Sequence, residues 1–523
     1  MGGGLLNIVS LGSENEMLNG NPKKTFFKAI YNKYANFGMQ KFRLDYDGLR
    51  IIQFNSETKM IFKIKRYADL LKNLTLVVNI PDIWSPLQKD ASGVWQDTSF
   101  KWIEELGFNM IKDIEYSIGG QTIAKYSGEY LSCIKSREMI AKKELLNHMI
   151  CNTNEFKDPE NYEGRTIKKY PSVYYQSGST PEPSINGRLL YIPIDQFFAY
   201  NDKSSIPLIS IQYSEIQVSI TFRPVKELYT LRSITTGNDL SPNLATSTDH
   251  IYRFIQPPTE VTGLLYDNKR NDWNADVHLI GTYIFLSDEE RKQKAKMDQS
   301  MLIRDVYETD KFNTTGSQMV KVISQNMVAN YMFRFRRSDA YERNQWSNYT
   351  NWKYEGIIPQ ELTNLNVPSP SSSFITGPAT TPSKNNKLIL KNMGILCDGK
   401  YRETLLDSGV FNYLDPYHFS KGSNKNGLYL YSFELATDMY NYQPSGAMNM
   451  SKFKNIEFEL TTILPESNPN ATFETICNLD GTAIGVRKGA PNLNLYNYDL
   501  RIFEERYNVL LFTAGNGSLV YAR

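Results

Sequence analysis

Apolar and polar residues alternate strictly in two separate segments of the chain, residues 216–222 and residues 455–460. The apolar positions are Ile216, Val218, Ile220 and Phe222 in the first segment, and Ile456, Phe458 and Leu460 in the second. Because successive side chains of a strand point to opposite faces, this period predicts half-buried antiparallel strands. The second segment follows a turn at 443–446 that contains proline and glycine, which strengthens the prediction.

Further short runs of β-branched, aromatic and apolar residues predict more strands. They are Thr75–Ile80, Leu189–Ile194, Leu208–Tyr213, Val277–Leu286, Tyr331–Phe335, Leu428–Leu435 and Tyr507–Phe512. Many short strands separated by turns are typical of β-sandwiches and barrels. We therefore expect an all-β protein.

Helical patterns are few and brief. Ser287 precedes acidic residues 288–290 and a basic segment at 291–296, an order that suits an N-cap and the helix dipole. The segment Ser136–Leu146 is a second candidate. Both helices are expected as additions to a β scaffold.

Chain length and loop composition predict two domains. A single hydrophobic core stops growing at about 250–300 residues, and the chain has 523. Long loops rich in Pro, Ser, Thr, Asn and Gly are expected at 152–186, 235–249 and 355–386. We predict an N-terminal arm (1–25), a first domain (26–224), a linker region (225–250) and a second domain (251–523).

Charge and cysteine usage exclude several classes of protein. The formal net charge is +2, too small for a protein that coats nucleic acid. The four cysteines have no C-x-x-C spacing, so reduced thiols are expected. The opening residues lack the basic region of a signal peptide, so secretion by that route is not expected. Leu6 stands where a myristoylation motif needs Ser or Thr, and no apolar run of about 18 residues occurs, so neither a lipid anchor nor a membrane-spanning helix is expected.

No catalytic, metal-binding or phosphate-binding motif has all the residues that its chemistry requires. The segment 477–482 is similar to an aspartyl phosphatase signature, but Asn478 stands at the nucleophile position and cannot supply a carboxylate. His148, His250, His278 and His418 lack metal-ligand spacing, and no phosphate-binding glycine loop occurs. We therefore predict no catalytic, cofactor-binding or metal-binding residues, no cofactor and no enzymatic activity.

Two basic clusters and six glycosylation sequons remain. The clusters are Lys23, Lys24, Lys28 and Lys33, and Arg334, Arg336 and Arg337 around Phe335. Alternation around Phe335 favours a solvated strand face; recognition of a neighbouring subunit, a membrane lipid or another protein is the alternative. The sequons at Asn73, Asn313, Asn348, Asn449, Asn470 and Asn516 are attributed to chance in an Asn-rich chain without a signal peptide.

Ordered segments along the whole chain resemble one known family. They begin with Gly2–Leu6, Asn19–Lys28, Tyr31 and Asn36-Phe37, and continue with Leu190–Pro193, Pro207–Ile209, Gln212–Ile216, Gln443–Gly446, Asn449–Ser451 and Tyr507–Leu510. Together they resemble the major capsid proteins of nucleocytoplasmic large DNA viruses. Residues 333–339 and 344–349 are more similar to the mimivirus-like branch than to the chlorella-virus branch, whereas Ile194–Phe198 and Tyr213–Glu215 depart from the family pattern.

The resemblance implies a specific fold and function. It implies two consecutive eight-stranded antiparallel jelly rolls with long loops and a few short helices, and trimeric pseudo-hexagonal capsomers that tile an icosahedral shell. The implied partners are two further copies, neighbouring capsomers, minor capsid proteins and the inner viral membrane, with glycans on outward loops and no direct nucleic acid. The implied location is the virion capsid, assembled in a viral factory of the host cytoplasm. A paralogous minor capsid or scaffolding protein and a carbohydrate-binding β-sandwich are the alternatives.

Overall fold

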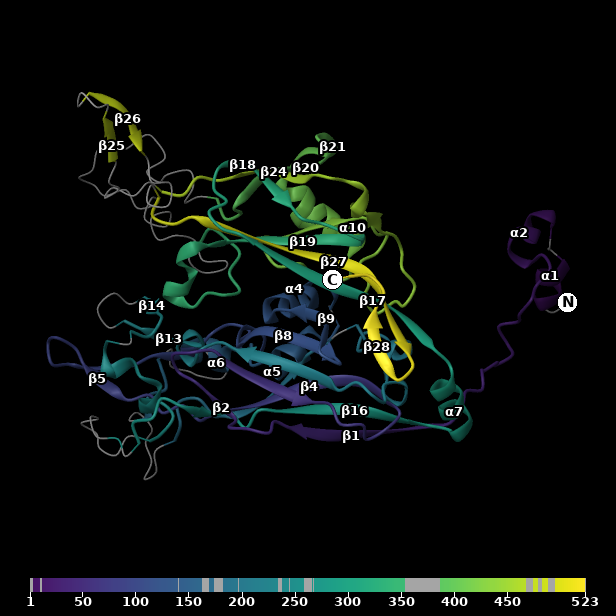
Figure 1. Cartoon of the computed structure of the whole chain (residues 1–523), viewed down its shortest axis with the longest axis horizontal. Coiled ribbons are helices and arrows are strands. Elements are labelled where there is room, and N and C mark those ends of the chain that lie inside the picture. The colour runs from purple at the N-terminus through teal and green to yellow at the C-terminus, as the bar shows by residue number, and fades with distance from the viewer. Residues whose placement is uncertain are drawn as a thin grey trace.

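The computed structural model describes residues 3–9, 12–139, 141–161, 169–173, 182–195, 197–233, 238–243, 245–257, 266, 268–352, 386–466, 474–477, 482–487 and 494–522. Most of these residues belong to two β-sandwiches that lie against each other with their strands roughly parallel to the long axis (Figure 1). A chain segment at the N-terminus extends away from both sandwiches.

The first sandwich consists of two facing antiparallel sheets. One has the order β1 (Phe37–Asp45), β16 (His278–Leu286), β4 (Leu70–Ile80) and β10 (Arg188–Pro193), with β11 (Ile206–Pro207) also beside β4. The other has the order β3 (Thr58–Lys63), β12 (Ile216–Phe222), β8 (Ile111–Ile118) and β9 (Gln121–Tyr126). Strands that are neighbours in space are therefore mostly distant in sequence.

The second sandwich repeats this strand order. One sheet runs β17 (Gln299–Lys311), β27 (Tyr498–Thr513), β19 (Met327–Arg337) and β22 (Leu428–Ser432), with β23 (Met448–Asn449) on β19 and β28 (Asn516–Leu519) on β27. The other runs β18 (Ser317–Val322), β24 (Ile456–Thr462), β20 (Leu390–Cys397) and β21 (Lys400–Asp407). The same path in both halves confirms the expected all-β class and the double jelly roll.

Short elements connect these strands. The helices of the first half and its boundary are α3 (Leu106–Asn109), α4 (Gly128–Glu138), α5 (Lys143–Met149), α6 (Asn154–Lys157) and α7 (Asp288–Lys296), and α10 (Asp415–Phe419) lies in the second half. The minor strands are β2 (Ile51–Ile52), β5 (Leu87–Lys89), β6 (Trp95–Asp97), β7 (Phe100–Trp102), β13 (Tyr229–Arg232), β14 (Asp239–Leu240), β15 (Trp273–Asn274), β25 (Glu474–Cys477) and β26 (Ala483–Arg487). Helices α1 (Gly3–Val9) and α2 (Glu16–Asn19) stand on the extended N-terminal segment.

The two alternating segments are correctly predicted strands. In both β12 and β24 each second residue is buried and the residues between them are half-buried. Each strand is central in its sheet, with β3 and β8 beside β12, and β18 and β20 beside β24. The alternating pattern thus marks the inner face of one sheet in each sandwich.

Two predicted elements are wrong. Leu208–Ser210 form a 3-10 turn, not a strand, because Pro207 removes an amide donor and Ile211 closes the turn by donating to the carbonyl of Leu208 at 3.2 Å. The predicted helix at 136–146 spans the end of α4 and the start of α5, because α4 begins well before residue 136 and is capped by Ser127. Helix α7 forms as predicted, but without a side-chain hydrogen bond from Ser287.

The predicted boundary at 225–250 assigns strand β16 to the second domain, whereas its hydrogen bonds join it to the first. Residues 278–286 pair along their whole length with β1 and also with β4. We therefore propose that the boundary lies after Leu286, at α7, from which the chain continues into β17. Of the expected long loops, most of 355–386 lies outside the described residues, as do parts of the other two.

Candidate functional site

The contact between the two jelly rolls is the part of the described structure in which charged side chains are most deeply buried. Helix α4 of the first roll lies against the sheet of β17, β27 and β19 of the second. One apolar core runs across this contact, since Met301, Ile303 and Phe503 belong to the same buried cluster as the first roll's interior. This contact between the two rolls, called the joint below, is thus both hydrophobic and ionic.

Glu129 on α4 is the centre of the first ionic group. Its carboxylate receives two bonds from Arg334, with Nε to Oε1 at 2.6 Å and Nη2 to Oε2 at 3.0 Å, and one from Arg501 Nη1 at 2.9 Å. Arg336 adds a contact of 3.4 Å. Burial alone would raise the pKa of Glu129, but these guanidiniums hold it well below its usual range.

Arg137 at the other end of α4 is the centre of the second ionic group. Its side chain is 0% exposed, and it contacts Glu505 of β27 at 3.0 Å and its neighbour Glu138 at 2.6 Å. Arg304 of β17 approaches the same Glu505 at 3.2 Å and Glu434 at 2.6 Å. Despite its burial, Glu505 keeps a lowered pKa because two guanidiniums face it.

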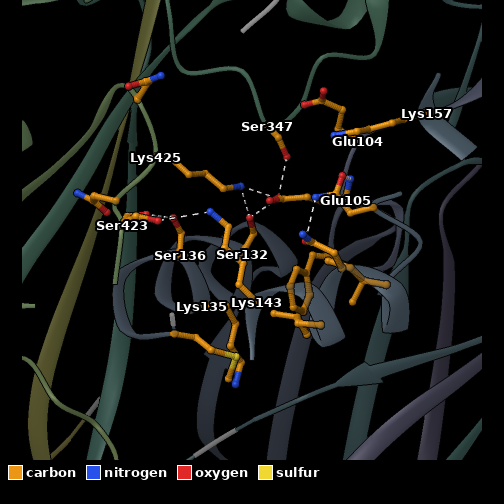
Figure 2. A pocket seen from close by; sticks show the side chains of 18 residues that line it. Glu104, Glu105, Ser132, Lys135, Ser136, Lys143, Lys157, Ser347, Ser423 and Lys425 are labelled. Carbon is orange, nitrogen blue, oxygen red and sulfur yellow. Dashed lines mark hydrogen bonds and ion pairs between the residues drawn. The ribbon is translucent and has the colours of Figure 1, made fainter. Parts of the chain in front are cut away.

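A cavity of about 350 Å³ opens beside the same helix (Figure 2). Glu105, from the loop before α3, points across it to the second roll, where Lys425 Nζ lies 2.5 Å away and the Ser347 hydroxyl donates at 3.1 Å. Ser132 on α4 also donates to this carboxylate. Glu105 adopts a left-handed backbone (φ 50°), so a strained residue is held in place by both rolls.

The groups around this cavity are occupied in joining the rolls. Lys425 compensates the burial of Glu105 and lowers its pKa. Cys133, the residue after Ser132 on α4, is buried, which raises the pKa of its thiol to about 12, so the thiol stays protonated at neutral pH and is a weak nucleophile. The geometry therefore suits a structural clasp between the two rolls.

The arginine cluster at 334–337 is not a solvated strand face, and that prediction is wrong. Arg334 is 1% exposed and pairs with Glu129 of the same chain. Arg336 packs on the Trp346 ring at 5.3 Å, and Arg337 packs on the Tyr496 ring at 3.5 Å. One face of β19 lies against the other jelly roll rather than water, so the arginines on that face form ion pairs with the first roll.

The lysine cluster at 23–33 lies on the extended N-terminal segment. Residues 12–36 are exposed nearly throughout, and their bulky apolar side chains are exposed with them. No helix of the described chain is long and apolar enough to cross a membrane. We call residues 12–36 the N-terminal arm; its described part continues beyond residue 25, where the sequence prediction ended it.

The histidines do not converge in the structure. His148 lies in the last turn of α5, His250 stacks on Phe54 with ring centroids 5.6 Å apart, His278 is buried in β16 and His418 lies in α10. No group of three His, Cys, Asp or Glu side chains in the described residues is arranged for a metal ion. Cys133, Cys151 and Cys397 are free and buried, and the phosphatase-like residues 478–481 lie outside the described residues.

Sequence reasoning missed Glu129, Arg137, Arg304 and Glu505. The available signal was the run Glu504-Glu505-Arg506 inside a strand that is otherwise rich in apolar residues. Charges in a strand interior are costly unless they are paired, so such a run indicates a buried ionic contact. The sequence cannot name the partners, because Arg137 and Glu505 are 368 residues apart.

Two family models match the chain and together cover most of it. The first, described as major capsid protein N-terminus, matches residues 25–256. The second, described as large eukaryotic DNA virus major capsid protein, matches residues 290–518. The gap between the two matches contains β16 and the start of α7.

Curated relatives and solved structures agree with these models. The chain is 26% identical to the major capsid protein of Paramecium bursaria Chlorella virus 1, with 100% of both chains covered, and 22% identical to probable capsid protein 4 of Acanthamoeba polyphaga mimivirus, covering 90% and 94%. The structure of the chlorella virus protein VP54 has a TM-score of 0.61 at 20% identity, with 95% and 100% covered. The Faustovirus major capsid protein has a TM-score of 0.61 at 12% identity, with 94% and 93% covered.

Proposed function

Because the chain belongs to the major capsid proteins of the large eukaryotic DNA viruses, we propose that it is the shell-building subunit of such a virus. In this proposal three copies form a pseudo-hexagonal capsomer, and capsomers tile an icosahedral shell. The observation that carries it is the repeated strand order of the two jelly rolls. A threefold trimer of two-roll chains presents six similar edges, which suits hexagonal packing.

The joint supports this role. A capsomer subunit must keep the angle between its two rolls fixed, because small rotations would be multiplied across the shell. The buried contacts of Glu129 and Arg137 specify one angle, since any other leaves a charge in the interior without its partner.

Purified chain tests the proposal directly. Multi-angle light scattering should give three times the mass of one chain, and electron micrographs should show particles of hexagonal outline. A monomer at micromolar concentration under native conditions would contradict the proposal.

The finer parts of the proposal concern partners and place. We propose contacts with neighbouring capsomers, minor capsid proteins and an inner viral membrane, glycans on outward loops, no direct nucleic acid, and assembly in a viral factory of the host cytoplasm. We also propose that the chain has no enzymatic activity and uses no cofactor. Placement nearer the mimivirus-like branch stays a prediction, because identities of 26% and 22% do not separate the two branches.

One observation favours a second function, that of a paralogous minor capsid protein. Among the relatives are both capsid protein 1 and probable capsid protein 4 of the same mimivirus. One virus can therefore encode several proteins of this kind. Copy number per virion distinguishes the two functions, because the main shell protein should be the most abundant chain in purified particles.

A further inference from the structure

Within the N-terminal arm the bases are separated from the acids. Residues 17–36 contain Lys23, Lys24, Lys28 and Lys33 and no Asp or Glu, whereas Glu14 and Glu16 precede them. The arm (12–36) thus carries four bases and two acids, a net +2, and since the whole chain carries +2 the rest of the chain is neutral overall. The stretch 17–36 therefore attracts anions.

The arm also exposes large apolar side chains. Phe26 and Phe27 are 103% and 98% exposed, and Ile30, Tyr31 and Tyr34 are 68%, 81% and 86% exposed. The hydrogen bonds described for residues 12–36 are local, such as the one from the Phe27 amide to the Thr25 hydroxyl. Figure 1 shows the arm standing away from the body of the molecule. A surface of this kind is costly in water unless a partner covers it.

The exposed residues have the spacing of an amphipathic helix. At about 100° per residue, Phe26, Ile30, Tyr34, Phe27 and Tyr31 fall within a sector of about 140°. Lys24, Lys28, Lys33, Asn32 and Asn36 fall on the remaining arc. The segment is not helical in the free chain, as expected for about twelve residues without tertiary support.

Helix α7 lies beside the root of the arm. Phe37, where the arm enters β1, pairs with Leu286, and only Ser287 separates Leu286 from α7. The helix and the residue after it expose Lys292, Lys296 and Met297, the last at 60%, together with the acidic Asp288 and Glu289. This neighbouring surface is therefore of mixed charge, and the basic stretch is confined to the arm.

We propose that residues 25–36 fold into an amphipathic helix that lies in the surface of an anionic lipid bilayer, with the Phe and Tyr side chains inserted and the lysines facing the headgroups. Aromatic rings with a polar edge and lysines on the opposite arc are the composition of interfacial helices. Single-stranded nucleic acid would use the lysines and could stack bases on the Phe and Tyr rings, but it leaves Ile30 without a function and does not require the apolar side chains to share one helical sector. This inference rests on the proposed function, in which the shell surrounds a membrane.

Vesicle binding by the full-length chain tests the proposal. Co-sedimentation should show about a hundred-fold tighter binding to mixed phosphatidylcholine–phosphatidylserine vesicles than to phosphatidylcholine alone, with salt weakening it, because each lysine near an anionic surface adds severalfold. Circular dichroism should show added helix only with the anionic vesicles.

Matched variants separate the two faces of the arm. The triple variant Phe26→Ser, Ile30→Ser, Tyr34→Ser should bind at least about tenfold more weakly, whereas Ala29→Ser, Asn32→Ser, Asn36→Ser on the polar arc should bind like the unaltered chain. Lys24→Gln, Lys28→Gln, Lys33→Gln should lose the preference for anionic vesicles. All three variants should melt like the parent, since the arm has no described contact with the body.

Several outcomes would overturn the proposal. They are absence of vesicle binding by the unaltered chain, equal binding by the apolar-face variant, or tighter binding of single-stranded nucleic acid than of vesicles. Light scattering on the same samples separates this proposal from the proposed function: trimers that ignore vesicles contradict only the arm proposal, and monomers contradict the capsid role. Loss of the trimer in the apolar-face variant would assign the arm to a second copy instead.

Discussion

Individual charged residues of this protein differ in their energetic weight according to whether they lie in the joint or on the surface. Glu129 is held by Arg334, Arg336 and Arg501 in the interior, whereas Glu215 meets Lys63 at 3.1 Å with both side chains about half exposed. Removing one member of a buried ionic group leaves uncompensated charge, while exposed pairs contribute little. The two glutamates therefore form a matched pair for experiment.

Replacing Glu129 with Gln should lower the free energy of unfolding by about 3–5 kcal/mol, because the buried guanidinium of Arg334 would lose its carboxylate partner. Glu215→Gln should lower it by less than about 1 kcal/mol. Urea denaturation followed by fluorescence measures both. Equal losses of unfolding free energy in the two variants would contradict the expectation that the buried ion pairs between the rolls stabilise the fold more than exposed pairs do.

Glu308 makes the joint sensitive to pH. Burial raises its pKa to about 7, although Arg501 at 3.6 Å and the amide and hydroxyl of Ser127 oppose the shift. Its folded pKa lies above that of an unfolded Glu, so its contribution to stability is present at low pH and is lost as pH rises through about 7.

The variant Glu308→Gln should therefore gain stability relative to the parent as pH rises from 6 to 8, by about 1 kcal/mol. Parallel thermal melts of parent and variant across this range measure the difference, which cancels the titration of other groups. A constant difference between the two proteins would refute this assignment.

At the scale of elements, the two short helices with a serine N-cap are not equivalent. The Ser127 side chain accepts from the Tyr130 amide at 3.2 Å and donates to Glu308 at 2.9 Å. Ser287 precedes α7 in an extended backbone but makes no side-chain cap bond. One serine thus caps its helix and also joins the two rolls, while the other only occupies the position.

Ser127→Ala should cost about 1–2 kcal/mol of stability, and Ser287→Ala less than about 0.5 kcal/mol. Chemical denaturation of both variants tests this comparison. A loss at Ser287 as large as that at Ser127 would show that the cap geometry at α7 differs from the one described.

Strand prediction succeeded where one face of the strand is buried. The alternation at 216–222 and 456–460 matches the structure, in which every second residue of each strand is buried on the inner face of the sandwich. It failed at 208–213, where apolar residues pack in a turn, and at 136–146, where α4 is buried on nearly all sides and shows no helical stripe. Periodicity reports burial on one face, so an element enclosed on all sides gives no periodic signal.

At the scale of the whole molecule, the shared core predicts that the two rolls unfold together. The buried cluster of the first roll includes Phe503 and Phe512 of β27, and the C-terminal hairpin returns to the first roll, where the Tyr213 amide donates to the Gly515 carbonyl at 3.0 Å. Folding of either roll alone would leave this apolar contact in water.

Calorimetry of the dilute chain should therefore show one transition, with calorimetric and van't Hoff enthalpies in agreement. Glu505→Ala, which removes the anion between Arg137 and Arg304, should shift that transition down by several degrees. Two well-separated transitions in the unaltered chain would contradict a single cooperative unit.

The sequence by itself determined the β class, the two-domain size and the ordered family segments, because alternation and turn residues are local properties that each stretch of chain carries with it. Only the tertiary structure decided which strands β16 pairs with, that Arg334 is buried and Arg336 half-buried, and which carboxylates meet Arg137 and Lys425. The physical reason is that a jelly roll pairs strands that are far apart in sequence. From local sequence alone, a charged side chain is predicted to be solvent-exposed. Whether it is in fact buried depends on a partner of opposite charge that can come from the other half of the chain.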